Sequence, residues 1–495
     1  MRRRGDNLRA APAAIFPTTA FAPITAFALI TVFALTAAFA APAAALEIKR
    51  SVLADGAVLL VSEQHQLPMV TMTIAFDAGA RRDPEGKGGL ASLTASSLTL
   101  GTKELSAAQF NQKVDFMGSS ISIGAGADYA QASFTSLKKY QDATLGLLAA
   151  ALTEPALSDA EITRKRDERV AGIKAQEEQP DYVAGVTFRK ALYGNAPYGH
   201  PSQGTAETVA KLAPQDVRDF YHAHYKAGSA VIAVVGDVKA DEVKAKLEKA
   251  LDALKGTVPA QAEPPAHRVA PGIHPTLVDR SVVQATIILG SGGVARANPD
   301  YYRLQVMNYI LGGGGFASRL MKIVRSKKGL AYGISSGFDA GKFPGSFAVD
   351  TQTKNKSTNE ALQLIVEQLR DIQKHPVSDA ELSSAKKYLI GSFPLKLDRQ
   401  SSIASFILQV ELYGLGLDYA ERYPKLIGAV TREDVQRVAQ KYLHPDALIL
   451  VAVTNQAEAA IDVANLNRVA EGSPAGAPAS STPGASEAAQ PAPGG

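Results

Sequence analysis

The stretch Asn308–Gly333, which reads NYILGGGGFASRLMKIVRSKKGLAYG, is the segment from which the rest of the chain is best interpreted. Its glycine run consists of Gly312, Gly313, Gly314 and Gly315. A run without Cβ atoms interrupts a helical pattern where the backbone bends or approaches another group closely. Arg325 and Tyr332 follow, seven residues apart across a basic turn. A guanidinium and a phenol at one place suit peptide carbonyls or a developing oxyanion. The alternative is an exposed arginine and a packed tyrosine.

The chain repeats one pattern of segments. For example, the strand-like VVQATIILGSGG corresponds to the earlier MVTMTIAFDAGA. The matched pairs are 69–80 with 282–293, 88–102 with 301–315, 164–194 with 383–414, and 213–237 with 431–454. Four matched blocks in the same order predict a duplicated α+β domain.

Composition excludes several classes of protein. The 495 residues are enough for two or three domains with full hydrophobic cores. The sequence has no cysteine, which excludes disulfide frameworks, thiol catalysis and cysteine-ligated zinc. Residues 1–45 hold four arginines against one aspartate, a net +3, so the remaining chain keeps only +1 of the total of +4. So small a charge gives no support to a nucleic-acid partner.

Residues 1–45 have the pattern of a signal peptide. A basic start, MRRRGDNLR, precedes an apolar segment that ends in the small residues APAAA. Cleavage after Ala40 and cleavage after Ala45 both fit this pattern, and we expect a periplasmic protein. The alternative is an uncleaved segment that anchors the protein, since about 20 apolar residues span a bilayer.

Composition also predicts where the domains begin and end. We expect an N-terminal domain at 46–255, a linker at 256–275 that contains five prolines, and a C-terminal domain at 276–467. Residues 468–495 are rich in Ala, Pro, Gly and Ser. They cannot bury enough apolar surface to offset the entropy of ordering, so we predict a disordered tail.

The order of these blocks, with GLAY at 329–332 after a glycine-rich helix, resembles the M16 peptidases, the group of pitrilysin, insulysin and the mitochondrial processing peptidase. The resemblance covers nearly all of residues 46–467. It implies two tandem homologous domains of α+β class, each a mainly antiparallel sheet with helices packed on it.

The zinc motif of that family is degenerate in this sequence. The family carries His-x-x-Glu-His on a helix of the first domain, and the residues that frame it are kept here at 89–91 and 101–102. Ser92 and Ser96 stand at the two histidine positions, and Ala95 stands at the position of the general base. Gly172 stands at the position of the third ligand, a glutamate. A catalytic zinc needs about three protein ligands, so we expect no metal and no cofactor in this chain.

Other residues offer no replacement for these ligands in the sequence. Of the eight histidines, only His222 and His224 are close neighbours. On a helix an i, i+2 pair points to different faces, which favours a structural or exposed role. An active peptidase with a new metal site remains a third possibility, which metal analysis would decide.

Arg325 and Tyr332 match, residue for residue, a pair that the C-terminal part of M16 enzymes contributes to the active site. There the pair holds the substrate carbonyl and stabilises the transition state. The glycines at 312–315 resemble the glycine-rich loop of the non-zinc subunit of the processing peptidase, which touches incoming peptide. A tight packing turn is the alternative.

Some family members divide these residues between two polypeptides. The resemblance implies an exported, zinc-free M16-like subunit, inactive alone, that forms a heterodimer with a zinc-bearing M16 partner. Arg325 and Tyr332 would then act in the partner's site on peptides or small proteins. The alternative is a non-enzymatic scaffold or peptide-binding homologue, as the respiratory core subunits of the family are.

Overall fold

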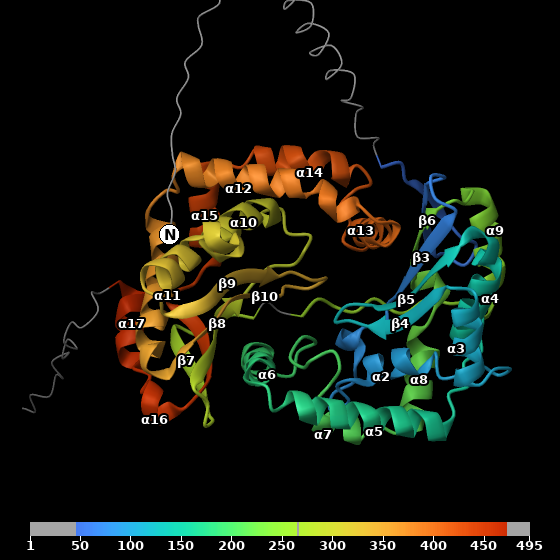
Figure 1. Ribbon diagram of the computed structural model, residues 1–495, viewed down its shortest axis with the longest axis horizontal. Helices are drawn as coiled ribbons and strands as arrows, with labels where there is room; N and C mark the ends of the chain where they lie inside the picture. Colours follow the sequence, from blue (N-terminus) through green and yellow to red (C-terminus); the bar gives the residue numbers. More distant parts are fainter. Residues whose placement is uncertain (1–45, 265–266, 473–495) are drawn as a thin grey trace, which may run out of the picture. The chain divides into compact units, whose positions relative to one another are not determined.

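The computed structural model describes residues 46–264 and 267–472 (Figure 1). The predicted signal peptide and most of the predicted tail lie outside these residues. From Glu47 onward the described chain forms one compact unit. No helix among the described residues is both long and apolar enough to cross a membrane.

The first half of the chain builds a six-stranded sheet in the order β1-β2-β6-β3-β5-β4. Its neighbours are antiparallel except for β2 and β6, which run parallel. The central strand β6, VIAVVG, is buried along its whole length, as its β-branched residues favour. The strands are β1 (Lys49–Val52), β2 (Val58–Glu63), β3 (Met69–Phe76), β4 (Ser120–Ala125), β5 (Ala130–Leu137) and β6 (Val231–Gly236).

The second half builds a five-stranded sheet in the order β7-β11-β8-β10-β9. Here β7 and β11 are the parallel pair, and the other neighbours are antiparallel. The strands are β7 (Gly272–Asp279), β8 (Gln284–Gly292), β9 (Ala331–Asp339), β10 (Ser346–Lys354) and β11 (Ala447–Thr454). Strands β2 to β6 therefore correspond in order and direction to β7 to β11, and the prediction of two tandem, mainly antiparallel α+β domains is confirmed.

Helices pack on both sheets. Many begin at side-chain caps, as α5 does at Ser158, whose hydroxyl accepts the N–H of Glu161. In the first half they are α2 (Leu90–Ser97), α3 (Ala107–Phe116), α4 (Gln141–Thr153), α5 (Asp159–Gln176), α6 (Pro180–Tyr193), α7 (Ala206–Ala210), α8 (Pro214–His224) and α9 (Ala240–Ala250). In the second half they are α10 (Tyr301–Asn308), α11 (Thr358–Lys374), α12 (Asp379–Ser392), α13 (Gln400–Leu412), α14 (Tyr419–Gly428), α15 (Arg432–Tyr442), α16 (Gln456–Ala459) and α17 (Val463–Glu471).

The two halves exchange one helix each. Helix α6 packs on β8 and β11 of the second sheet, and α13 packs on β3 and β6 of the first. Phe188 of α6 is buried with Ile288 and Val451 of the second sheet. A Cβ added at Gly290 would lie 2.8 Å from the Phe188 ring, so the glycine permits this close approach. The exchange ties the two halves together through apolar contacts.

Two predicted boundaries differ from the structure. Strand β7 begins at Gly272, inside the segment 256–275 that we predicted as the linker. Proline is tolerated there because β7 is an edge strand, which pairs only with β11. Helix α17 extends to Glu471, inside the segment predicted as the tail, because Leu466, Val469 and Ala470 are buried.

Candidate functional site

Helix α2 presents the two serines of the degenerate zinc motif side by side. Ser92 and Ser96 are one turn apart on the same face and are both partly exposed. Ala95, between them in sequence, is fully buried. The helix is fixed at its start by Asp83, whose carboxylate accepts the N–H groups of Gly89 and Ala91 at 2.7 Å each.

Two effects act in opposite directions on the pKa of Asp83. Its burial raises the pKa of the carboxyl to about 7, and its hydrogen bonds from backbone N–H groups of α2 act in the opposite direction. The cap therefore holds the helix that carries Ser92 and Ser96 from a position shielded from water.

A guanidinium lies against both serines. Arg169, from α5, donates to the hydroxyl of Ser92, to the hydroxyl of Ser96 at 2.9 Å and to the carbonyl oxygen of Ser92 at 3.3 Å. Burial lowers the pKa of Arg169, with the charge of Glu168 acting in the opposite direction, but an arginine remains charged in proteins. A fixed positive charge thus contacts the two side chains at the metal-ligand positions of the predicted motif.

The position that the resemblance assigns to the third zinc ligand carries no side chain. Gly172 lies three residues after Arg169 and so on the same face of α5. A Cβ added at Gly172 would meet no atom within 4 Å, which leaves space for a side chain that the sequence does not supply.

Other potential metal ligands are scattered. Within residues 46–264 and 267–472, no three His, Cys, Asp or Glu side chains are grouped so as to hold a metal ion. His224 stacks on Phe220 with the ring centroids 4.4 Å apart, and burial lowers its pKa. His222 contacts the Tyr221 ring. Both histidines are therefore engaged with aromatic rings rather than with each other.

The second half brings Arg325 and Tyr332 together. The guanidinium carbon of Arg325 lies 4.9 Å from the ring centroid of Tyr332 and 4.6 Å from that of Phe316. The ring of Phe316 is 67% exposed and Tyr332 is 84% exposed. Cation–π attraction to two rings holds the arginine at the surface with its N–H groups available. We name Phe316, Arg325 and Tyr332 the aromatic–arginine cluster.

A β-bulge accounts for the exposure of Tyr332. Ala331 pairs with Thr353 and Ile334 pairs with Thr351, so Tyr332 and Gly333 together oppose one residue of β10. Bulges re-aim side chains and are frequent at sheet edges, and β9 is an edge strand. The Thr351 hydroxyl stabilises the bulge by donating to the carbonyl oxygen of Gly333 at 2.9 Å.

The glycine run begins in the last two residues of a π-helical turn, η5 (Tyr309–Gly313), and ends before a second one, η7 (Met321–Lys327). Gly312 is buried, and a Cβ there would lie 2.7 Å from the backbone N of Ser336. Gly315 has a positive φ of 54° and open space around it. Gly312 therefore serves packing against β9, whereas Gly313 and Gly315 are exposed. The peptide-binding role of the run stays a prediction.

Ion pairs of Arg319 anchor the segment that directly precedes η7 (Met321–Lys327), the turn that carries Arg325. Arg319 donates to both carboxylate oxygens of Glu381, at 2.7 and 3.1 Å, and to Asp371 at 2.9 Å. Burial alone would raise the pKa of Glu381, but the hydrogen bonds and charge of Arg319 hold it at about 2. The aromatic–arginine cluster thus rests on a fixed support.

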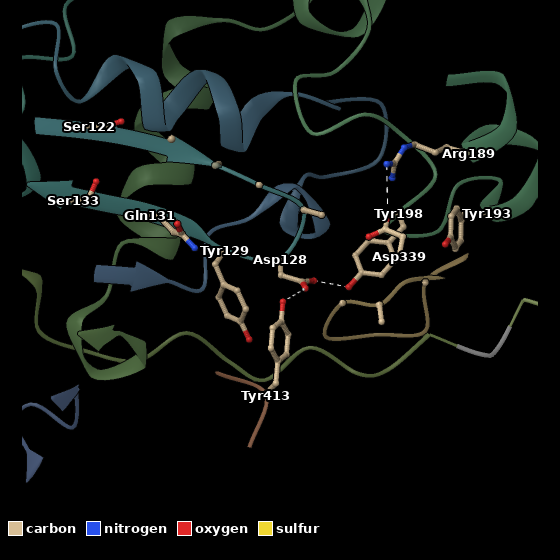
Figure 2. Close-up of a pocket in the computed structure, with 17 residues that line it drawn as sticks. Ser122, Asp128, Tyr129, Gln131, Ser133, Arg189, Tyr193, Tyr198, Asp339 and Tyr413 are labelled. Carbon is tan, nitrogen blue, oxygen red and sulfur yellow. Dashed lines mark hydrogen bonds and ion pairs between the residues drawn. The ribbon is translucent and has the colours of Figure 1, made fainter. Parts of the chain in front are cut away.

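Residues of both halves line a polar cavity of about 530 Å³ beside β4 (Figure 2). Its most shielded charge is Asp128, which accepts hydrogen bonds from Tyr198 at 2.5 Å and Tyr413 at 3.3 Å. The backbone N–H of Lys342 donates to the same carboxylate at 2.8 Å. Burial and the charge of Asp128 raise the pKa of both tyrosines, so both phenols remain donors.

Two family models match the sequence. The insulinase family, peptidase family M16, matches residues 58–206, and the peptidase M16 inactive domain matches residues 211–389. A solved structure described as a peptidase M16 inactive domain from Pseudomonas fluorescens is 30% identical and has a TM-score of 0.77. It covers 83% of this chain, and the match spans 98% of its own length. The chain belongs to the M16 peptidase family.

M16 relatives carry contrasting names. A Helicobacter pylori protein named as the non-peptidase homolog YmxG is 25% identical over 400 residues, 80% of this chain and 92% of the relative. A Streptomyces coelicolor protein named as an uncharacterized zinc protease is 26% identical over 402 residues, 80% of this chain and 87% of the relative. A solved protease from Helicobacter pylori, 21% identical with a TM-score of 0.76 over 82% of this chain, supports the fold alone.

The M16 site residues predicted from the sequence fall into two groups. Ser92 and Ser96 come together on α2, and Arg325 and Tyr332 come together beside η7. Among the described residues, no hydrogen bond, ion pair or ring contact joins one group to the other. Sequence reasoning missed Arg169 and Phe316, because it assigned roles only to the metal-ligand positions, the glycine run and the Arg/Tyr pair. The sequence did contain one indication of this contact, because Arg169 stands about one helical turn before Gly172.

Proposed function

We propose that this protein is an exported, zinc-free M16 subunit that pairs with a zinc-bearing M16 subunit and assists in cleaving peptides or small proteins. The observation that carries the proposal is the contrast between the two groups of site residues. Ser92 and Ser96 are bonded to a guanidinium and offer no ligand set, whereas Arg325 and Tyr332 are held at an exposed edge strand.

The residues of the second half would supply substrate contacts. An extended peptide adds to an edge strand through backbone hydrogen bonds, with little demand on its sequence. Arg325 would donate to a peptide carbonyl, and the Tyr332 hydroxyl would donate to the oxyanion that develops at the scissile carbonyl. The metal ion and the general base would come from the partner.

The name of the Helicobacter pylori relative also supports a chain without its own hydrolytic activity. It equally favours a second function, that of a non-enzymatic peptide-binding homologue. In this case the chain would hold peptides without any zinc-bearing partner. The export proposal rests on the signal-like pattern of residues 1–45.

The test is reconstitution. The purified chain is mixed with an M16 subunit that carries His-x-x-Glu-His, encoded near it, and cleavage of a quenched fluorescent peptide is followed. We expect no cleavage by the chain alone and cleavage by the pair. Tyr332→Phe should lower kcat by about 100-fold, the loss seen when one oxyanion donor is removed. Arg325→Ala should lower kcat/KM, because it removes a hydrogen bond to a peptide carbonyl.

Matched controls separate this role from general damage. Arg399→Ala removes a 79% exposed arginine side chain, and Tyr388→Phe changes a 57% exposed tyrosine on α12. Both controls should leave kcat and kcat/KM unchanged. Full activity of the pair with both Arg325→Ala and Tyr332→Phe would refute the assisting role. Binding of the peptide without cleavage by any such pair would favour the peptide-binding function.

A further inference from the structure

Among the described residues, no carboxylate forms an ion pair with Arg169, and the charge of Glu168 acts on it without a direct contact. The hydrogen bonds of Arg169 go to Ser92 and Ser96, which are neutral, and no described carboxylate lies within ion-pair distance of it. The adjacent Glu168 is exposed and pairs with Lys165 at 3.0 Å and with Arg164 at 3.5 Å.

Two other shielded arginines pair with carboxylates, whereas Arg296 packs against the rings of Tyr301 and Tyr419. Arg81 contacts Asp77, and Arg319 contacts Asp371 and Glu381. A partly buried guanidinium is stabilised by a carboxylate through charge-assisted hydrogen bonds. Arg169 has no carboxylate in direct contact among the described residues, and this is a structural reason to expect a ligand that carries one.

The hydrogen bonds of Arg169 leave donors available. A guanidinium has five N–H groups, and this one makes three hydrogen bonds, all from its two terminal nitrogens. The Nε makes none of these three hydrogen bonds. It is also not a buried atom without a partner, and the residue is partly exposed. The serines fix the plane of the guanidinium, so an incoming carboxylate meets an oriented group with little side-chain entropy left to lose.

The surroundings have room for a peptide. Gly172, on the same face of α5, has open space where a side chain would project. Helix α2 contacts β4, and among the described residues β4 pairs only with β5, so β4 is an edge strand of the sheet (Figure 1). A free strand edge offers backbone hydrogen bonds to an extended peptide. Helix α2 thus contacts both α5, which carries Arg169, and the edge strand β4.

We propose that Arg169, oriented by Ser92 and Ser96, is a carboxylate-binding site for an extended peptide. The carboxylate is the C-terminus of the peptide or the side chain of an Asp or Glu. Arginine keeps its proton and offers no coordination position to water, so this site holds the peptide without hydrolysing it. The inference concerns the first half of the chain and does not depend on a zinc-bearing partner.

The test uses four fluorescein-labelled pentapeptides and fluorescence anisotropy with the full chain. Two are Thr-Val-Thr-Val-Ala as the free acid and as the amide. The other two are amides that end in Glu or Gln. We expect the free acid, the Glu peptide or both to bind at least about 10-fold tighter than the neutral matched peptide, with a preference that weakens at high salt.

Variants test whether Arg169 is the residue that causes the preference for peptides with a carboxylate. Arg169→Gln should abolish it, and Arg169→Lys should retain part of it because the charge remains. Arg164→Gln is the control, since Arg164 lies on the same helix but is exposed and paired with Glu161. Thermal melts verify that each variant is folded. Equal binding of all four peptides, a preference that survives Arg169→Gln, or no binding at 1 mM protein would each overturn the proposal.

Discussion

The carboxylate of Asp128, between β4 and β5 in the first half of the chain, accepts a 2.8 Å hydrogen bond from the backbone N–H of Lys342 in the second half. Tyr413, which follows α13, reaches the same carboxylate. Arg81 lies 3.9 Å from it and supplies a buried positive charge. One shielded anion therefore joins segments that are far apart in sequence.

We predict that Asp128→Asn lowers the free energy of unfolding by about 2–4 kcal/mol, because it removes a buried charge on which several donors converge. Urea denaturation followed by circular dichroism measures the change. The exposed Asp115 gives the matched control, and Asp115→Asn should stay within about 0.5 kcal/mol of the wild type. Equal stability of the two variants would show that the Asp128 network contributes nothing net.

A second prediction concerns Phe316, the exposed ring on which Arg325 stacks. If the proposed function holds, Phe316→Ala should lower kcat/KM of the reconstituted pair by about 2- to 5-fold. This is the factor that an exposed cation–π contact of about 0.5–1 kcal/mol represents. The stability of the chain should change by less than about 0.5 kcal/mol, since the ring is exposed. An unchanged kcat/KM would mean that Tyr332 alone positions Arg325.

Much of the fold follows from local patterns in the sequence. The matched blocks identify the duplication, and they place helix α8 (Pro214–His224) opposite α15 (Arg432–Tyr442) of the second half. The parallel edge strand β7 was not predicted, because it contains Pro275 and few buried residues. The exchange of α6 and α13 also escaped, since an apolar helix face does not specify which sheet covers it.

The residues of the candidate site could be predicted only where they belong to a recognisable motif. The spacing of Arg325 and Tyr332 predicts a pair, and the structure brings their side chains together. The bulge that exposes Tyr332 depends on the register with β10, which one strand's sequence does not reveal. Arg169 was missed because a search for metal ligands passes over arginine, which has no lone pair to donate.

The support of the aromatic–arginine cluster should be sensitive to acid. The pKa of Glu381 is lowered from 4.5 to about 2 in the folded chain, so its contribution is complete above pH 4.5 and is lost as the pH falls toward 2. We expect Glu381→Gln to cost about 1–2 kcal/mol at pH 7, after allowance for solvent screening, and progressively less below pH 4. Urea titrations at pH 7, 4.5 and 3 measure this.

Glu360 gives the control for that experiment. It pairs with Lys328 at 3.0 Å, and both side chains are about half exposed. Such surface pairs contribute about 0–1 kcal/mol, so Glu360→Gln should change stability little at any of the three pH values. If Glu381→Gln lowers the free energy of unfolding equally at all three pH values, the carboxylate acts through its shape rather than its charge.

The final prediction concerns metal binding at the degenerate motif. Ser92→His, Ser96→His and Gly172→Glu together restore three ligand types at the M16 positions. With Arg169 retained, the guanidinium stands close to the restored ligands, and repulsion of a divalent cation about 4 Å away costs several kcal/mol even at an effective dielectric constant of about 20. We therefore expect the added change Arg169→Leu to tighten zinc binding by at least about 100-fold, as measured by competition with a chromogenic chelator.

Two comparisons make that result decisive. Arg164→Leu, added to the triple variant in place of Arg169→Leu, removes an exposed arginine of the same helix and should leave the zinc affinity within about 3-fold. The wild type should bind no stoichiometric zinc, because Ser92 and Ser96 are poor ligands and Gly172 is none. Equal zinc affinity with and without Arg169 would mean that the guanidinium swings away at little cost. The loss of three ligands alone would then account for a zinc-free chain.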